Sequence, residues 1–264
     1  MAVQSIRRYA GAVSGVLGAV FVLWLTPALI CAQEPVEGDT APFDYAWEVR
    51  FREEAIGYSL SRFCFIDEGG ERGLCADGYR SFAFEIGPVS IHVTEQTRVM
   101  WDDRGDMREL EARTAVGDDI TITRALRTAD GVSIVKKTEK REKEHLFTSD
   151  EYDHTDVDRF LHTLDGLSDK KTYRILSISE DKVKSISYEY LGASDFFVSG
   201  MELVCHRIGF EGPRSTGEML VDGLGIPVSF SMDTVLGSFT FVPCDPALAE
   251  ESLFSTEPDF LNVP

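Results

Sequence analysis

The sequence predicts a mainly β protein, built as a single curved antiparallel sheet or open half-barrel with one or two short helices packed on it. Three observations predict this fold class. Apolar and polar residues alternate in many short runs, turn-forming Gly, Asp and Pro residues separate the runs about every 8–14 residues, and no low-complexity linker divides the chain. Evenly spaced short strands are typical of a meandering antiparallel sheet, which can leave one face in water.

The first 32 residues are typical of a secretory signal peptide. A basic start precedes an apolar run over 16–25, and Ile30 and Ala32 suit the −3 and −1 positions of a signal peptidase site. Retention as a membrane anchor is the alternative, although the run is shorter than the roughly 20 residues that span a bilayer. A lipoprotein anchor at Cys31 is disfavoured because Ile30 is too large. We therefore expect export to the periplasm or beyond, with 33–43 as a loose leader and no stable membrane span after cleavage.

The strongly negative net charge argues against a nucleic-acid partner. The net charge of −19 becomes −21 once the two arginines of residues 1–32 are removed, and 232 residues remain. A surface this acidic repels phosphate backbones and anionic lipid headgroups, so a nucleic-acid partner is not expected. The length suffices for a sizeable core.

A hairpin opens the β-rich domain, which we expect to span 44–245. Aromatic and aliphatic residues of 45–52 fall on one face and charges on the other, and 56–61 forms the return strand. Further strands of the first block are expected at 81–86, 90–100, 107–115, 120–126 and 132–137. A charge run over 136–144 is interpreted as a solvated edge or hairpin tip, with a partner surface as the alternative. Strands of the second block are expected at 173–178, 183–190, 196–198, 202–210, 216–221, 226–232 and 238–242.

Two helices are expected. Apolar residues at 157, 160, 161 and 164 recur at helical spacing, so a helix is predicted over Asp156–Leu164, with Thr155 or Asp156 as its cap and Gly166 after its end. The tail at 246–264 can hold a second, short helix from Pro246 to Leu253.

Four cysteines remain after cleavage, and an even number in an exported chain favours disulfides. Cys64 and Cys75 flank a turn-rich segment as strand ends flank a hairpin loop, and Cys205 and Cys244 stand at the ends of late apolar runs. We expect the pairs 64–75 and 205–244, although four cysteines allow three connectivities. No spacing indicates a zinc site or a thiol activated by a nearby base.

Several segments resemble exported bacterial proteins of the DUF3108 and DUF6134 type, which also occur beside transglutaminase-like domains. The segments are YAWEVRFREEAIGYS, LFTSDEYDHT, KKTYRILSISEDKVKSISYEYLG and GEMLVDGLGIPVSFSM. The resemblance implies an open β-barrel or half-barrel with a helix against it, loosely similar to the LolA/LolB lipoprotein carriers. It carries no enzymatic residues, and it matches Gly57 and Gly225 to turn or bulge positions. The 64–75 segment and the high acidity depart from the pattern.

The densest polar cluster is the acidic segment 150–158. Asp153, Asp156 and Asp158 are weak candidates for holding a calcium ion, but the spacing, central glycine and closing glutamate of an EF-hand are missing. Helix capping and a solvated loop are the simpler explanation. His154 and His162 could share a helix face, although surface histidines are commoner than a site. No catalytic residues and no cofactor are assigned.

Aromatic residues are the remaining functional signal. They fall in the expected strands and either fill the core or line a concave groove for a hydrophobic ligand. They are Tyr45, Trp47, Phe51, Tyr58, Phe82, Phe84, Trp101, Tyr188, Tyr190, Phe230, Phe239 and Phe241. The first hypothesis is a non-enzymatic exported module that binds a lipid, another hydrophobic ligand or an envelope protein. The alternatives are a structural envelope protein with a filled core, and a metal-dependent enzyme that uses 150–158.

Overall fold

The computed structural model describes residues 42–68, 71–159, 169–198 and 201–256. The predicted signal peptide and positions 33–41 of the predicted leader lie outside the described residues. In the described ranges, fifteen strands form one sheet, and one helix, α3 (Pro246–Thr256), packs against it. No helix of these ranges is long and apolar enough to cross a membrane.

In chain order the strands are β1 (Phe43–Phe51), β2 (Glu54–Glu68), β3 (Glu71–Ile86), β4 (Val89–Trp101), β5 (Met107–Val116), β6 (Asp119–Thr128), β7 (Gly131–Thr138), β8 (Glu142–Thr148), β9 (His154–Thr155), β10 (Lys171–Ser177), β11 (Lys182–Val198), β12 (Met201–Glu211), β13 (Ser215–Val221), β14 (Pro227–Thr234) and β15 (Gly237–Pro243). Every expected run lies in a strand to within one residue at its ends, but β2 and β3 extend well beyond their expected runs, the runs at 183–190 and 196–198 form one strand, and β8 and β9 were not expected.

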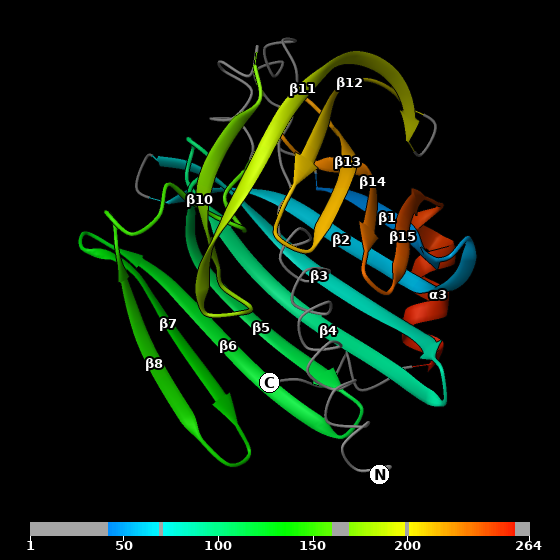
Figure 1. Cartoon of the computed structure of the whole chain (residues 1–264). Helices are drawn as coiled ribbons and strands as arrows, with labels where there is room; N and C mark the ends of the chain where they lie inside the picture. Colours follow the sequence, from blue (N-terminus) through cyan, green and yellow to red (C-terminus); the bar gives the residue numbers. More distant parts are fainter. Residues whose placement is uncertain (1–41, 69–70, 160–168, 199–200, 257–264) are drawn as a thin grey trace.

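The sheet consists of two meanders joined at the middle. Its order is β8-β7-β6-β5-β4-β3-β2-β1-β15-β14-β13-β12-β11-β10-β9, so every paired strand is the sequence neighbour of its partner except at the β1–β15 junction. All pairs are antiparallel apart from β9 and β10. The sheet curls strongly, so that the second meander arches over the first (Figure 1). The predicted fold class, a single curved antiparallel sheet with a short helix on it, is confirmed.

Period-two patterning divides the sheet into an inner and an outer face. Along β1 the residues Tyr45, Trp47, Val49 and Phe51 all enter one large buried cluster, as expected for alternate residues of a strand. A bulge in the β1–β2 pairing follows at Val49, opposite Gly57. A Cβ on Gly57 would lie 2.1 Å from the carbonyl oxygen of Ser81, so only glycine fits there.

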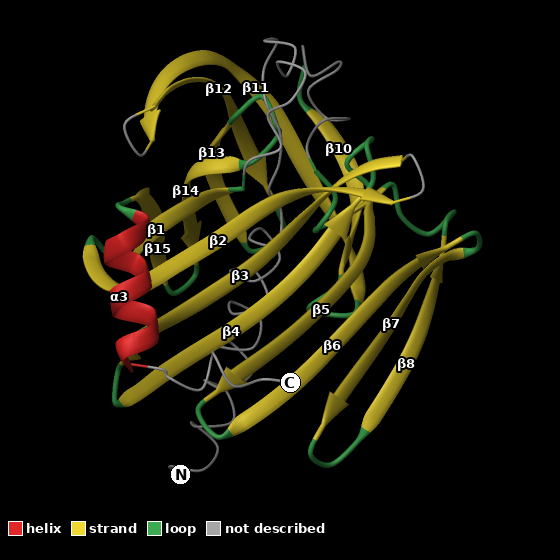
Figure 2. Ribbon diagram, turned by 180° about the vertical axis from the view of Figure 1, so that it is seen from behind, coloured by secondary structure: helices red, strands yellow, loops and turns green. Residues whose placement is uncertain are grey.

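Helix α3 covers part of the outer face. Its Ala249 and Leu253 pack with Ala46 of β1 and Leu60 of β2 in a second, smaller cluster. Arg62 Nη2 of β2 lies 2.6 Å from Glu250 Oε1 and ties the helix to the sheet. Figure 2 shows α3 lying across the ends of β1, β2 and β3. The short helix expected from Pro246 is present, three residues longer than predicted.

Candidate functional site

The inner face of the sheet is rich in packed aromatic side chains from both meanders. The ring centroids of Phe51 and Phe239 lie 4.7 Å apart, and those of Phe51 and Phe84 lie 5.3 Å apart. Phe210 and Phe230 stack with nearly parallel rings at 5.5 Å. Of the twelve predicted aromatic residues, ten are buried, whereas Tyr190 is half-buried and Tyr58 packs on the outer face near α3. Apart from Tyr58, the predicted aromatic residues therefore lie on the inner face.

A polar band crosses this apolar face. Ser59, Arg80, Glu95, Thr114 and Thr121 stand directly opposite one another on the consecutive strands β2 to β6. Thr97 and Thr123 belong to the adjacent inner row, in which Ala112 lies between them. We call these seven residues the polar band. Alternation places Arg80 on the same face as the core residue Phe82, and Glu95 on the same face as Val93. Polar side chains therefore lie within the otherwise apolar inner face.

A buried ion pair occupies the centre of the polar band. Arg80 Nη1 lies 3.1 Å from Glu95 Oε1, and only 6% of Arg80 and 4% of Glu95 is exposed. Thr114 donates a hydrogen bond to Glu95 Oε2 at 3.1 Å. Burial raises the pKa of Glu95 and lowers the pKa of Arg80, while the attraction between the two groups opposes both shifts. Sequence reasoning missed this pair. Arg80 and Glu95 each stand two residues from a core residue, where the alternation of the strand calls for an apolar side chain, and this signal could have revealed them.

Residues Tyr152–Arg159 form a strap that connects the two meanders. On one side, the backbone amides of Asp153 and Asp156 donate hydrogen bonds to the carbonyls of Arg174 and Leu176 in β10. On the other side, Trp101 Nε1 of β4 donates to the carbonyl of Val157 at 2.7 Å. The strap thus spans from one end of the sheet order to the strands β4 to β6, and it closes the curled sheet with loop contacts instead of a strand pair.

The three predicted metal-binding aspartates have separate structural partners. Asp153 pairs with Arg174 at 2.8 Å, and these hydrogen bonds lower its pKa. Asp158 accepts hydrogen bonds from the backbone of Met107 at 2.8 Å and from Arg127 at 2.6 Å.

Asp156 is buried and accepts from the amide of Ile178 at 3.1 Å, and burial raises its pKa to about 7. The described part of the chain contains no group of three His, Cys, Asp or Glu residues that could hold a metal ion. The structure therefore gives these carboxylates roles in fixing the strap.

The helix predicted over Asp156–Leu164 is wrong at residues 156–159, which are not helical. Positions 156–159 form a turn, and 160–164 lie outside the described residues, as does His162. Thr155 Oγ1 accepts the amides of Val157 and Asp158, as a cap would, but Asp158 is also bound to β5 and β6. Contacts to distant strands override the local helical pattern at this segment.

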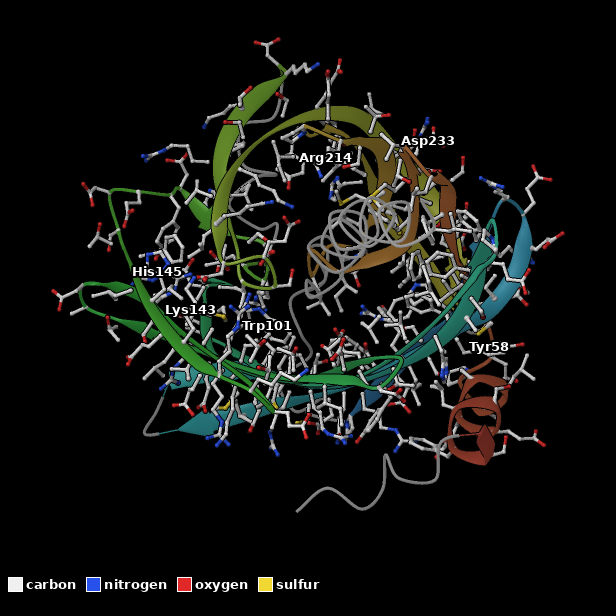
Figure 3. The ribbon with its side chains drawn as sticks, turned by 60° about the horizontal axis from the view of Figure 1, so that its bottom comes forward. Tyr58, Trp101, Lys143, His145, Arg214 and Asp233 are labelled. Atoms are coloured by element: carbon white, nitrogen blue, oxygen red, sulfur yellow. The ribbon has the colours of Figure 1, made fainter. Side chains whose placement is uncertain are left out.

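A polar seam joins β7 and β8 to the turn between β10 and β11. Lys136 Nζ donates to the carbonyl of Ser179 at 2.5 Å, Lys143 pairs with Asp181, and His145 Nδ1 lies 3.2 Å from Asp181 Oδ1. Figure 3 places Lys143, His145 and Trp101 on the same side of the ring of strands. The charge run over 136–144 does form the predicted hairpin tip, but its Lys136 and Lys143 contact the β10–β11 turn in this seam.

All four described cysteines carry free thiols. Cys64 and Cys75 are directly opposite each other on β2 and β3, and burial raises the pKa of Cys75 to about 11. Cys205 lies in the main inner cluster, whereas Cys244 packs with the second cluster near α3. Three strand intervals, or about 14 Å, separate β12 from β15, which exceeds the reach of a disulfide. The predicted 205–244 pair is therefore wrong.

No family model matches the chain, and no curated protein does. Two solved structures are similar in shape. One is a β-barrel-like protein of the domain of unknown function DUF1849 from Brucella abortus, with a TM-score of 0.53, 10% identity and coverage of 78% of this chain and 97% of that chain. The other is a DUF1089 family protein from Pseudomonas aeruginosa, with a TM-score of 0.37, 16% identity and coverage of 63% and 86%. The first shows a β-barrel-like fold; the resemblance to DUF3108 and DUF6134 proteins stays a prediction.

Proposed function

We propose that this protein is exported, that its first 32 residues are removed, and that it then binds a hydrophobic or amphipathic ligand on the inner face of its sheet without catalysing a reaction. The observation that carries the proposal is how the sheet closes. Its end strands β8 and β9 are not paired with each other, and the strap and the seam hold the curled sheet together. A few loop and side-chain contacts can part and re-form more easily than a strand ladder, so an apolar ligand has a route to the aromatic inner face.

Binding on this face agrees with the residues that form it. Aromatic and aliphatic side chains dominate, and few polar groups stand among them, which is the usual composition of a site for a small apolar ligand. The two buried indoles, Trp47 and Trp101, donate to backbone carbonyls and need no ligand to satisfy them. They also provide fluorescence reporters on that face.

The alternative is a structural envelope protein with a filled core. The low exposure of the inner aromatic residues, which is 0% for Phe239 and Phe241, favours it. Native mass spectrometry of the protein purified from its own host decides between the two. A co-purifying lipid, or uptake of a lauroyl-chain probe accompanied by a change in tryptophan fluorescence, supports ligand binding. A mass with no adduct and no response to any probe supports the filled core.

Export has a separate test and a chemical consequence. The intact mass of the mature protein is expected to correspond to cleavage after Ala32, and a full-length mass would refute removal of the signal. In an oxidising compartment the opposed thiols of Cys64 and Cys75 are expected to form a disulfide, because directly opposed residues in antiparallel strands have Cα separations of about 4.5–5.5 Å. This pair therefore remains part of the proposal.

A further inference from the structure

We propose that the polar band selects an amphiphile with an uncharged, hydroxyl-rich headgroup, which it binds while the apolar rows beside it take the acyl or alkyl chain. This inference rests on the proposed function and names the ligand class of the same face. Its starting point is an arrangement that a merely filled core does not require: Ser59, Arg80, Glu95, Thr97 and Thr123 are all more than nine-tenths buried. Burying such groups costs free energy unless they gain partners.

The band has the extent and surroundings of a headgroup site. From Ser59 on β2 to Thr121 on β6 it crosses four strand intervals, or about 19 Å. An apolar row borders it on each side. Phe82 and Val93 oppose each other in one row, and the other is Phe63, Ala76, Val99, Leu110, Ala125 and Ile134. A ligand with a polar end and an apolar chain can therefore meet matching groups within one face.

The charges of the band indicate an uncharged head. Arg80 and Glu95 neutralise each other at 3.1 Å, so a bound anion would compete with Glu95 for Arg80, and a bound cation would compete with Arg80 for Glu95. Either competition leaves a buried charge without its counter-charge. The net charge of −19 further disfavours an anionic ligand.

Hydroxyl groups match the donors and acceptors of the band in chemical type. Serine and threonine hydroxyls both donate and accept, Arg80 donates only, and ionised Glu95 accepts only. A ligand hydroxyl can donate to Glu95 or accept from Arg80 without separating the pair. Several hydroxyls on one headgroup can therefore form hydrogen bonds with Thr97, Thr114 and Thr123 at once. The ligand class is accordingly a polyol ester or ether of a long chain.

The test compares probes that share a twelve-carbon chain and differ in the head. Monolaurin and dodecyl maltoside are uncharged and carry hydroxyls, laurate is anionic, and dodecyltrimethylammonium is cationic. Binding to the mature protein is measured below micellar concentrations by tryptophan fluorescence and native mass spectrometry. We expect both uncharged probes to bind at least about tenfold more tightly than either charged probe.

A matched pair of variants tests the band itself. Thr97→Val removes a hydroxyl from the inner face of β4, whereas Thr94→Val makes the same change on the outer face of the same strand. We expect Thr97→Val combined with Thr114→Val to weaken monolaurin binding about tenfold, since each lost hydrogen bond contributes a factor of several. Thr94→Val leaves binding unchanged, and circular dichroism confirms that all variants are folded.

The outcomes separate this inference from the proposed function. Equal binding of all four probes, or tightest binding of laurate, overturns the headgroup assignment while ligand binding on the inner face stands. Unchanged monolaurin binding by the folded Thr97→Val and Thr114→Val double variant overturns it as well. A failure of every probe to bind overturns the proposed function itself, and the assignment of a headgroup with it.

Discussion

The indole nitrogen of Trp101 donates a hydrogen bond to the carbonyl oxygen of Val157 at 2.7 Å, and Val157 lies two residues after the short strand β9 that pairs with β10. One contact therefore links strands β4 and β10, which are far apart in the sheet order. Both residues are fully buried, so neither partner can replace the bond with water.

Trp101→Phe is expected to loosen the strap. The substitution leaves the Val157 carbonyl buried without its donor and removes part of a buried ring, which together cost about 2–4 kcal/mol of unfolding free energy. Urea unfolding measures the loss, and hydrogen exchange is expected to rise most over 152–159. Trp47→Phe is the matched control. The indole of Trp47 donates to the carbonyl of Val228, so its loss is not expected to raise hydrogen exchange in the strap. Equal exchange of the strap in both variants would contradict the assignment.

Asp156 is expected to make stability fall as the pH rises. Burial raises its folded pKa to about 7 from an unfolded value near 3.8, so the folded state binds the proton more tightly. The stabilisation is complete below about pH 4 and is lost as the pH passes through 7. Asp156→Asn keeps an acceptor for the Ile178 amide, and it is expected to stabilise the protein by up to about 4 kcal/mol at pH 8 and not at pH 4.

Asp153, in the same strap, is expected to make stability depend on pH in the opposite direction. Its hydrogen bonds from Arg174 lower its pKa, so its contribution is present above its unfolded pKa and is lost as the pH falls through the folded value. Asp153→Asn is expected to destabilise by less than about 1 kcal/mol at pH 7, because the pair is solvent-exposed. Thermal unfolding at pH 4 and pH 7 checks this, and a larger loss at pH 4 than at pH 7 would refute it.

Oxidation is expected to join Cys64 to Cys75 selectively. The two residues oppose each other in register, whereas Cys205 and Cys244 lie in different clusters. Peptide mapping of the mature protein without reductant is expected to show the 64–75 bond, with stabilisation of about 2–3 kcal/mol relative to Cys64→Ser. The Cys205→Ser and Cys244→Ser double variant retains the bond. A 205–244 cross-link would show that the register described for these strands is wrong.

Asp181→Asn is expected to open the seam without unfolding the protein. The carboxylate of Asp181 contacts both Lys143 and His145, and it is largely buried. Its loss weakens the contact between β8 and the β10–β11 turn, so hydrogen exchange of 142–148 is expected to rise, while the unfolding free energy changes by about 1 kcal/mol. Glu142→Gln, which removes an exposed partner of Lys137 on the outer face, is the control and leaves exchange unchanged.

Most strand positions and the inner face could be predicted from the sequence because both follow from a local period of two, whereas β8, β9 and the outer parts of β2 and β3 were missed. Trp47 and Phe51 alternate with Glu48 and Arg50 within one strand, and no distant information is needed to assign their faces.

The remaining features depend on pairs that meet only through the register of the sheet. Arg80 and Glu95 stand on different strands, and their contact exists because β3 and β4 pair with that particular offset. The helix predicted for the strap was wrong because Asp158 and Val157 contact strands about fifty residues earlier in the chain. Local periodicity carries no information on such contacts.

The junction of β1 with β15 determines the order in which the chain can complete its fold. The pairs within β1 to β8 join sequence neighbours and can form soon after these strands emerge, but the other edge of β1 stays unpaired until residues 237–243 arrive. During this interval an edge carrying Trp47, Val49 and Phe51 is unpaired, and such an edge invites pairing with other chains. The arrival of β15 therefore ends the period in which the protein is most vulnerable to aggregation.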